Sequence, residues 1–191
     1  MRKIVLASTS LPRKQILSKS GLKFAVRESS FEEDMTLRMS PEKLAEHLSA
    51  GKARAIAENC SDALVIAADT FIAYKNQKLG KPKTAKRAAE MLRMLSGKRH
   101  KIITGVTIID TKTGKTLTFH ETTKIFMKKM SPAEIAGYVA TGEPLHKAAG
   151  YALQERGAVF IKKIDGDFFN AMGLPIARLM DELKKFGVRV F

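Results

Sequence analysis

An aspartate and a threonine interrupt the most apolar stretch of the chain, which reads LVIAADTFIAY over residues 64–74. An ionised carboxylate is costly to remove from water unless it is paired or bound to a cation. Two interpretations of Asp69 follow. Either it caps a turn between two buried strands, 64–68 and 71–74, or it ends the first strand at a place where a charged group must be bound.

A second candidate is Ser8–Lys14, where hydroxyl side chains and two basic residues follow an apolar, strand-like run. Free backbone N–H groups at a helix N-terminus bind anions, and the guanidinium of Arg13 fits phosphate oxygens. The alternative is an ordinary N-cap with a basic first turn. Cations in a first turn oppose the helix dipole, so the segment favours a phosphate site that includes Ser8 and Arg13.

The most acidic segment of this basic chain is Glu32–Asp34, in a predicted loop at 29–37. Clustered carboxylates resist ionising together unless a cation neutralises them. Because the ligands would all be oxygens, Mg²⁺ or Mn²⁺ would be the natural cation. A solvated acidic loop is the alternative, and both interpretations stay open for Glu33.

Two lysines and an amide complete the candidates. Lys52 follows Gly51, a mid-helix glycine that costs about 1 kcal/mol against alanine and could allow the close approach of another group. Lys81, between a glycine and a proline, could return to Asp69 if the chain folds back. Gln154 could donate to and accept from a base edge, or be an ordinary amide at a strand end.

The elements that must position these residues alternate along the chain. Helices are predicted at 13–19, 40–60, 84–95, 131–142 and 175–187, where caps, prolines and glycines mark their ends. Strands are predicted at 4–7, 23–27, 64–68, 71–74, 102–109, 117–127 and 159–164. Several strands follow one another without a helix, so we expect an α/β fold with a partly antiparallel sheet.

Composition limits the class of protein. The 191 residues, 45% of them hydrophobic, fit one α/β domain or two small lobes that share a sheet. The net charge of +15 favours a polyanionic partner, which could be nucleic acid, an acidic membrane surface or a phosphorylated small molecule.

The motifs that the sequence lacks limit the cellular compartment and the kinds of site that the protein can have. With Cys60 as the only cysteine, no internal disulfide or cysteine-based zinc cluster can form. The absence of a signal peptide predicts a cytoplasmic protein, and the apolar runs are shorter than the ~20 residues of a membrane helix. There is no paired-histidine metal motif, Walker A sequence, dinucleotide fingerprint or serine elbow.

Taken in order, these motifs resemble the Maf family of nucleoside triphosphate pyrophosphatases. The resemblance covers nearly the whole chain and treats 1–191 as a single domain. The matching segments are LASTSLPRK at 6–14, Glu32–Glu33, Lys52–Ala53, Ala68–Thr70, Gly80–Pro82, Leu95–His100, Thr104–Val106, Thr141–Pro144 with Lys147, and Gly173–Pro175.

The resemblance implies an ITPase-like α/β fold, with a long mixed sheet and two lobes around a central cleft. It also implies a divalent metal, an assembly that is often a homodimer, and hydrolysis of a nucleoside triphosphate to the monophosphate and pyrophosphate. Asp69 would match the catalytic acid and, with Glu33, would hold the metal. The phosphate-and-metal site would be completed by Ser8, Arg13, Lys52 and Lys81.

Thr70 and Gln154 match the dTTP/UTP branch of the family, whereas the branch acting on 7-methyl-GTP has Gln and Glu at these positions. The chain departs from the dTTP/UTP pattern at Pro12, where an arginine is usual, and at Glu155, where a glycine is usual. 7-methyl-GTP or another modified nucleotide therefore stays an alternative substrate.

The alternative from another class is a nucleic-acid-binding or cell-division regulatory protein without turnover. The charge of +15 suits it, but no RNA-recognition aromatic pair, KH loop or helix-turn-helix is visible.

Overall fold

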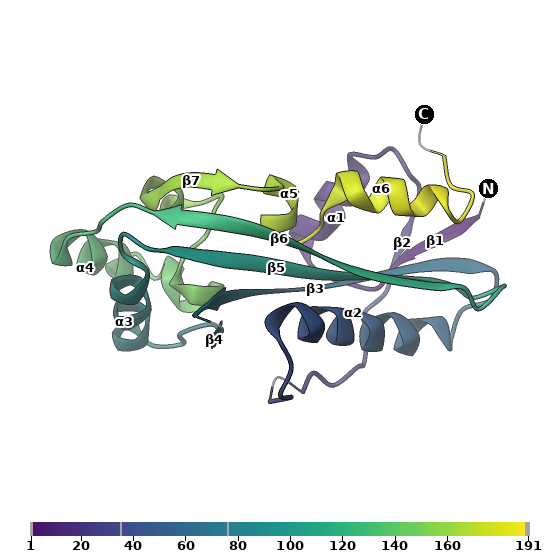
Figure 1. Cartoon of the computed structure of the whole chain (residues 1–191), viewed down its shortest axis with the longest axis horizontal. Helices are drawn as coiled ribbons and strands as arrows, with labels where there is room; N and C mark the ends of the chain where they lie inside the picture. The colour runs from purple at the N-terminus through teal and green to yellow at the C-terminus, as the bar shows by residue number, and fades with distance from the viewer. Residues whose placement is uncertain (1, 35, 76, 190–191) are drawn as a thin grey trace. The chain divides into compact units, whose positions relative to one another are not determined.

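The computed structural model describes residues 2–34, 36–75 and 77–189, so position 35 of the predicted acidic loop lies outside the described residues. These residues form a mixed sheet in the order β2-β1-β3-β5-β6-β7, with β4 paired to β3 (Figure 1). The strands are β1 Lys3–Leu6, β2 Ala25–Val26, β3 Ala63–Tyr74, β4 Gln77–Leu79, β5 Arg99–Asp110, β6 Thr116–Met127 and β7 Ile161–Asp165.

Strand directions confirm the predicted mixed α/β class. β1 runs parallel to β2 and β3, whereas β4 is antiparallel to β3 and β7 is antiparallel to β6. Two of the predicted strands are shorter than expected. β2 covers only two residues of 23–27, and Val159 belongs to a 3₁₀ turn before β7.

Helix starts follow the predicted capping chemistry. Ser40 and Thr84 each accept a hydrogen bond from a backbone N–H of the first turn, and Ser131 forms a capping box with Glu134. The helices are α1 Leu11–Ser18, α2 Pro41–Ala57, α3 Ala85–Leu95, α4 Pro132–Ala140, α5 Phe168–Ala171 and α6 Ile176–Lys184. Short 3₁₀ helices follow α4: η1 Glu143–His146, η2 Ala148–Gly150 and η3 Arg156–Phe160.

The chain divides into two compact units. The first comprises Met1–Thr70, Ile103–Glu121 and Phe168–Phe191, and the second comprises Phe71–Ile102 and Thr122–Asp167. Within the described residues, no helix has the length and apolarity needed to cross a membrane.

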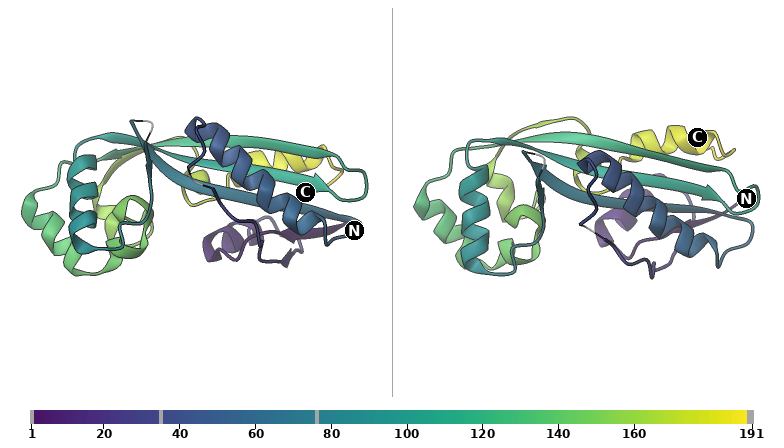
Figure 2. Two further views of the ribbon diagram at one scale, coloured as in Figure 1. Left: turned by 90° about the horizontal axis from the view of Figure 1, so that it is seen from below. Right: turned by 60° about the horizontal axis from the view of Figure 1, so that its bottom comes forward.

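Strand alternation organises the core of the first unit, because successive side chains point to opposite faces of the sheet. Leu64, Ile66 and Ala68 pack in one cluster with residues of α1 and α6. Ala63, Val65 and Ala67 pack in another with Ala53 and Ile56 of α2. Figure 1 shows α2 and α6 on opposite sides of the strands, and Figure 2 shows α2 lying across them.

The predicted interruption at Asp69 and Thr70 is wrong, because β3 is continuous from Ala63 to Tyr74. Alternation continues through the two polar residues. Asp69 extends the series that faces α2, and Thr70 extends the series that faces α1 and α6. Each of these two polar side chains has a partner on its own face of the sheet. The strand therefore continues through both residues.

Gly105 of β5 lies directly beneath α2. A Cβ there would lie 2.1 Å from the carbonyl oxygen of Ala45, whereas a Cβ at Gly137 of α4 would meet nothing within 4 Å. We expect Gly105→Ala to lower the free energy of unfolding by about 1–3 kcal/mol, because overpacking displaces the helix. Gly137→Ala, the control, should raise it by up to about 1 kcal/mol. Urea denaturation measures both, and equal effects would contradict this packing.

Candidate active site

The ammonium of Lys52 lies between two carboxylates. Its Nζ is 2.5 Å from Oδ1 of Asp69 and 2.6 Å from Oε1 of Glu33. Asp69 is buried in β3, Lys52 comes from α2, and Glu33 comes from the acidic loop. Three distant segments therefore place the predicted catalytic acid, the predicted metal ligands and a cation at one point.

The acidic loop is attached to α2 beside Lys52. The ring of Phe31 fills the space left by Gly51, since a Cβ at that glycine would lie 2.3 Å from the ring. The hydroxyl of Ser29 donates to the carbonyl oxygen of Lys52 at 3.3 Å and accepts from the backbone N–H of Phe31 at 3.2 Å. The close approach expected at Gly51 is thus made by the loop that carries Glu33.

Arg13 is fixed by three neutral acceptors. Its Nε donates to the carbonyl oxygen of Gly173 at 2.9 Å, Nη1 to the hydroxyl of Ser8 at 3.2 Å and Nη2 to the hydroxyl of Thr70 at 2.9 Å. Burial lowers the pKa of Arg13, while the charges of Asp69 and Glu33 act in the opposite direction. Since a guanidinium has five N–H donors, two remain for a ligand.

The N-terminus of α1 adds donors beside Arg13. Ser10 is the N-cap residue, but its side chain accepts no hydrogen bond from the helix, and no acidic residue lies in the first turn. The first N–H groups of α1 therefore lack a side-chain acceptor from the cap, an arrangement that favours an anion.

Thr104 and Gly173 contact Thr70 and Arg13, and the sequence assigned neither of them a role. The Thr104 hydroxyl lies 3.0 Å from that of Thr70 and donates to the carbonyl oxygen of Asn170 at 3.0 Å. Gly173 has φ +111°, and a Cβ there would lie 3.4 Å from Nε of Arg13. Both residues belong to matching segments of the resemblance, which was the only signal available for them.

Lys81 and Gln154 belong to the second unit. Lys81 is exposed in the segment between β4 and α3, and Gln154 is exposed in a bend before η3. The bend contradicts the alternative in which Gln154 ends a strand. In the first unit, the structure brings together Ser8, Arg13 and Thr70, and it brings together Glu33, Lys52 and Asp69.

The two carboxylates suit a hard cation. Both reach the same ammonium, which shows that they converge on one positive charge. Within the part of the chain that the structure describes, no group of three or more His, Cys, Asp or Glu side chains could hold a metal ion. Mg²⁺ fits a site with two carboxylates because it commonly keeps waters and binds substrate phosphates.

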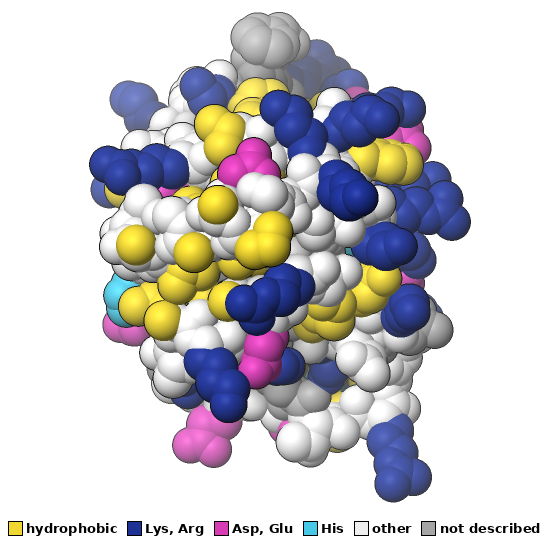
Figure 3. All heavy atoms as spheres, turned by 90° about the vertical axis from the view of Figure 1, so that its left-hand side faces the viewer, with side chains coloured by type: hydrophobic (Ala, Val, Ile, Leu, Met, Phe, Trp, Pro, Cys, Tyr) yellow, Lys and Arg dark blue, Asp and Glu magenta, His cyan; other side chains and the backbone are white. Residues whose placement is uncertain are grey.

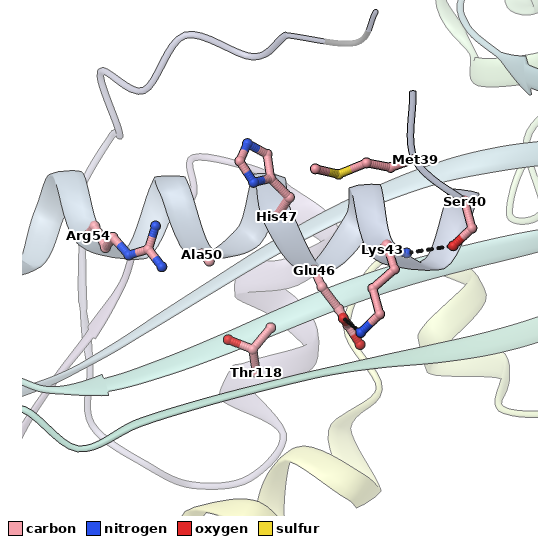
Figure 4. Close-up of a pocket in the computed structure, with 8 residues that line it drawn as sticks. All are labelled: Met39, Ser40, Lys43, Glu46, His47, Ala50, Arg54 and Thr118. Carbon is pink, nitrogen blue, oxygen red and sulfur yellow. Dashed lines mark hydrogen bonds and ion pairs between the residues drawn. The ribbon is translucent and has the colours of Figure 1, made fainter. Parts of the chain in front are cut away.

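A cavity of about 550 Å³ lies elsewhere on α2, in the same unit (Figure 4). Side chains from successive turns of the helix line it, together with Met39 and Thr118 of β6. None of the predicted site residues lines this cavity, so it does not belong to the site described above.

The chain is similar to known proteins over most or all of its length. The family model described as Maf-like protein matches residues 3–186. A dTTP/UTP pyrophosphatase of Methanosarcina barkeri is 45% identical, with 100% of this chain and 98% of that protein covered. One of Bacillus cereus (strain AH820) is 44% identical, with the same coverage. Among solved structures, a HAM1 protein from Coxiella burnetii is 16% identical with a TM-score of 0.48, covering 97% of this chain and 100% of that one.

The hydroxyl of Thr70 can be tested without assuming an activity. We expect Thr70→Val to lower the free energy of unfolding by about 1–3 kcal/mol, because it removes an acceptor from the partly buried Arg13. Thr107→Val is the control, since Thr107 is a buried strand threonine whose hydroxyl, among the described residues, contacts those of Ser49 and Thr118 and not Arg13. Its cost should be smaller, about 1 kcal/mol. Thermal or urea unfolding that ranks Thr107→Val as the more damaging change would contradict the assignment.

Proposed function

The chain belongs to the Maf-like protein family, and we propose that it hydrolyses nucleoside triphosphates to the monophosphate and pyrophosphate, with dTTP and UTP as preferred substrates. The observation that carries the proposal is the buried Asp69 paired with Lys52, which also pairs with Glu33. The next residue of the strand, Thr70, accepts a hydrogen bond from Arg13. The names of the relatives support the two nucleotides. We also propose that both units act as one catalytic domain, 1–191.

The triphosphate is held by donors that the fold leaves unused. Arg13 offers its two remaining N–H groups, and Lys52 offers the third proton of its ammonium. The first N–H groups of α1 and the hydroxyl of Ser8 lie beside Arg13. Lys81 of the second unit contributes a further positive charge. Together these groups orient the phosphates and stabilise the charge that develops on the leaving pyrophosphate.

Asp69 acts on the attacking water. It accepts a proton from the water or orients it towards the α-phosphorus, and the pyrophosphate leaves as the new P–O bond forms. Lys52 is the partner of Asp69 in its buried position, where its ammonium lies 2.5 Å from Oδ1 of the carboxylate. Thr70 acts through Arg13, since its hydroxyl is engaged with that side chain and with Thr104.

Glu33 and Asp69 are the residues that would hold Mg²⁺ or Mn²⁺. When bound, such an ion neutralises phosphate charge and polarises the phosphoryl oxygens. Carboxylate oxygens are the ligands these cations prefer, and both side chains already converge on one positive charge.

Base selection is assigned to Gln154, whose amide carries one donor group and one acceptor that suit a pyrimidine edge. The position is exposed and therefore free to meet a ligand.

The competing nucleic-acid-binding function finds no support in the charge distribution of the surface in view. Lys and Arg side chains are spread over the face shown in Figure 3, among apolar and acidic ones. A protein that tracks a nucleic acid usually gathers them in a patch or stripe.

The reaction class is tested by its products. Purified protein with dTTP and Mg²⁺ should release pyrophosphate and dTMP in equal amounts, measured by ³¹P NMR. Excess EDTA should abolish turnover, and added Mg²⁺ or Mn²⁺ should restore it. Orthophosphate as the first product, or undiminished activity in EDTA, would refute the proposal.

Asp69→Asn should lower kcat by at least about 10²-fold, because an amide cannot accept the proton of the water. The fold should survive, since Glu33 still neutralises Lys52. Asp110→Asn is the matched control: Asp110 is also a buried strand carboxylate, but its partner is Arg2. The control should lose stability and keep kcat. Steady-state pyrophosphate release and circular dichroism separate the two effects, and near-normal turnover by Asp69→Asn would refute the mechanism.

Gln154→Ala should reduce the preference for dTTP over dGTP by about ten- to a hundred-fold, since losing a hydrogen-bonding partner commonly costs about 1–3 kcal/mol. Gln77→Ala, another exposed glutamine of the second unit, is the control. Ratios of kcat/KM across a nucleotide panel measure the effect. If 7-methyl-GTP gives the highest kcat/KM in the unaltered protein, the pyrimidine assignment is wrong while the pyrophosphatase assignment stands.

A further inference from the structure

The bend that carries Gln154 is attached, on both of its sides, to other segments of the second unit. We call residues Tyr151–Gly157 the Gln154 loop. Residues on either side of Gln154 make hydrogen bonds or ion pairs to other segments of the same unit, although Gln154 itself is exposed. An exposed side chain at the centre of a tethered loop is typical of a recognition residue held in place by its neighbours.

Glu143 makes the densest of these attachments. Its Oε1 accepts from the hydroxyl of Tyr138 at 2.6 Å and from the backbone N–H of Gly157 at 3.0 Å. Its Oε2 accepts from the backbone N–H of Arg156 at 3.0 Å. Burial alone would raise the pKa of Glu143, but the hydrogen bonds from Tyr138, Gly157 and Arg156 lower it below its ordinary value. One ionised carboxylate therefore holds the C-terminal side of the loop.

The other side of the loop is held by a buried pair. Nε2 of His100 lies 2.6 Å from the hydroxyl of Tyr151, and both side chains are almost fully buried. Burial lowers the pKa of His100 to about 4, so the ring is neutral at pH 7. Beside Gln154, Glu155 pairs with Lys147 at 2.5 Å. The position where the dTTP/UTP branch has a glycine thus carries an additional attachment in this chain.

Packing leaves the loop little freedom near Glu143. A Cβ at Gly157 would lie 2.5 Å from the hydroxyl oxygen of Tyr138 and 2.8 Å from the carbonyl oxygen of Ala152. The loop backbone therefore lies directly against Tyr138, the residue that also donates to Glu143.

The segment that begins at Glu143 also holds Lys81. The backbone N–H of Ala149 donates to the carbonyl oxygen of Gly80 at 3.0 Å, and that of Lys83 donates to Leu145 at 3.4 Å. Lys81 lies between these two hydrogen bonds. The residues proposed to bind phosphate and base are thus both attached to the stretch from Glu143 to Gly157.

We propose that Glu143 is a positioning residue for base selection: its carboxylate fixes the Gln154 loop so that the amide of Gln154 meets the base in one orientation. The inference rests on the proposed function for its kinetic part. Fixing a recognition group in advance reduces the ordering cost on binding and increases discrimination between ligands.

The test compares Glu143→Gln with the unaltered protein. The amide keeps the size of the side chain but presents N–H groups where Oε2 accepts from Arg156. Hydrogen exchange at residues 155–157 should become at least about ten-fold faster. The ratio of kcat/KM for dTTP over dGTP should fall by about ten-fold, through a higher KM for dTTP, with kcat nearly unchanged.

Two further variants make the result specific. Glu134→Gln is the matched control, since Glu134 also accepts from a backbone N–H and a hydroxyl but caps α4 and contacts no loop residue. It should alter neither the exchange at 155–157 nor the nucleotide ratio. Tyr138→Phe removes one hydrogen bond from Glu143 and should produce a smaller change in the same direction. If Glu143→Gln does not fold, the Tyr138→Phe variant tests whether Glu143 holds the Gln154 loop.

Unchanged exchange in both variants would overturn the attachment by Glu143, and faster exchange with an unchanged nucleotide ratio would overturn its part in base selection. If the unaltered protein releases no pyrophosphate from any nucleotide, the proposed function and the kinetic part of this inference fail together. The exchange measurement then still decides whether Glu143 holds the loop.

Discussion

The contact on which the site depends is the ammonium of Lys52 held between Asp69 and Glu33. The side chains of Lys52 and Asp69 are only 13% and 9% exposed, so removing Lys52 would leave the buried charge of Asp69 uncompensated, at a cost of about 3–5 kcal/mol. The helix, the strand and the acidic loop must therefore meet at one atom. Two glycines make this possible, since Gly105 lets α2 lie directly on β5 and Gly51 receives the ring of Phe31.

Strand alternation then divides the site into two halves. Asp69 and Thr70 are neighbours in one continuous strand, so their side chains must point to opposite faces of the sheet. Asp69 meets Lys52 of α2, and Thr70 meets Arg13 of α1. The charges of Asp69 and Glu33 nevertheless act on Arg13. Because Asp69 and Thr70 are adjacent in β3, the position of the Asp69–Lys52 pair is fixed relative to that of the Thr70–Arg13 contact.

Local chemistry explains what the sequence could predict. Ser40, Thr84 and Ser131 cap helices through contacts three residues away, and the continuous apolar run of β3 is readable in eleven letters. The predicted break at Asp69 failed because the partners that make a polar pair tolerable there come from residues 17 and 57 positions away. Thr104 and Gly173 carry no local signal at all, since their role is to complete contacts of Arg13 and Thr70.

The charged side chains of the candidate site in the first unit are equal in number of each sign. Two carboxylates, Asp69 and Glu33, stand against two basic side chains, Lys52 and Arg13, so the formal charges of the four sum to zero. A triphosphate brings several negative charges, and their mutual repulsion would not be offset by a neutral group. If the proposed reaction is correct, the missing positive charge must come from outside these four residues. A divalent cation is one source that the chemistry offers, and the two carboxylates that converge on Lys52 are the side chains that would retain it.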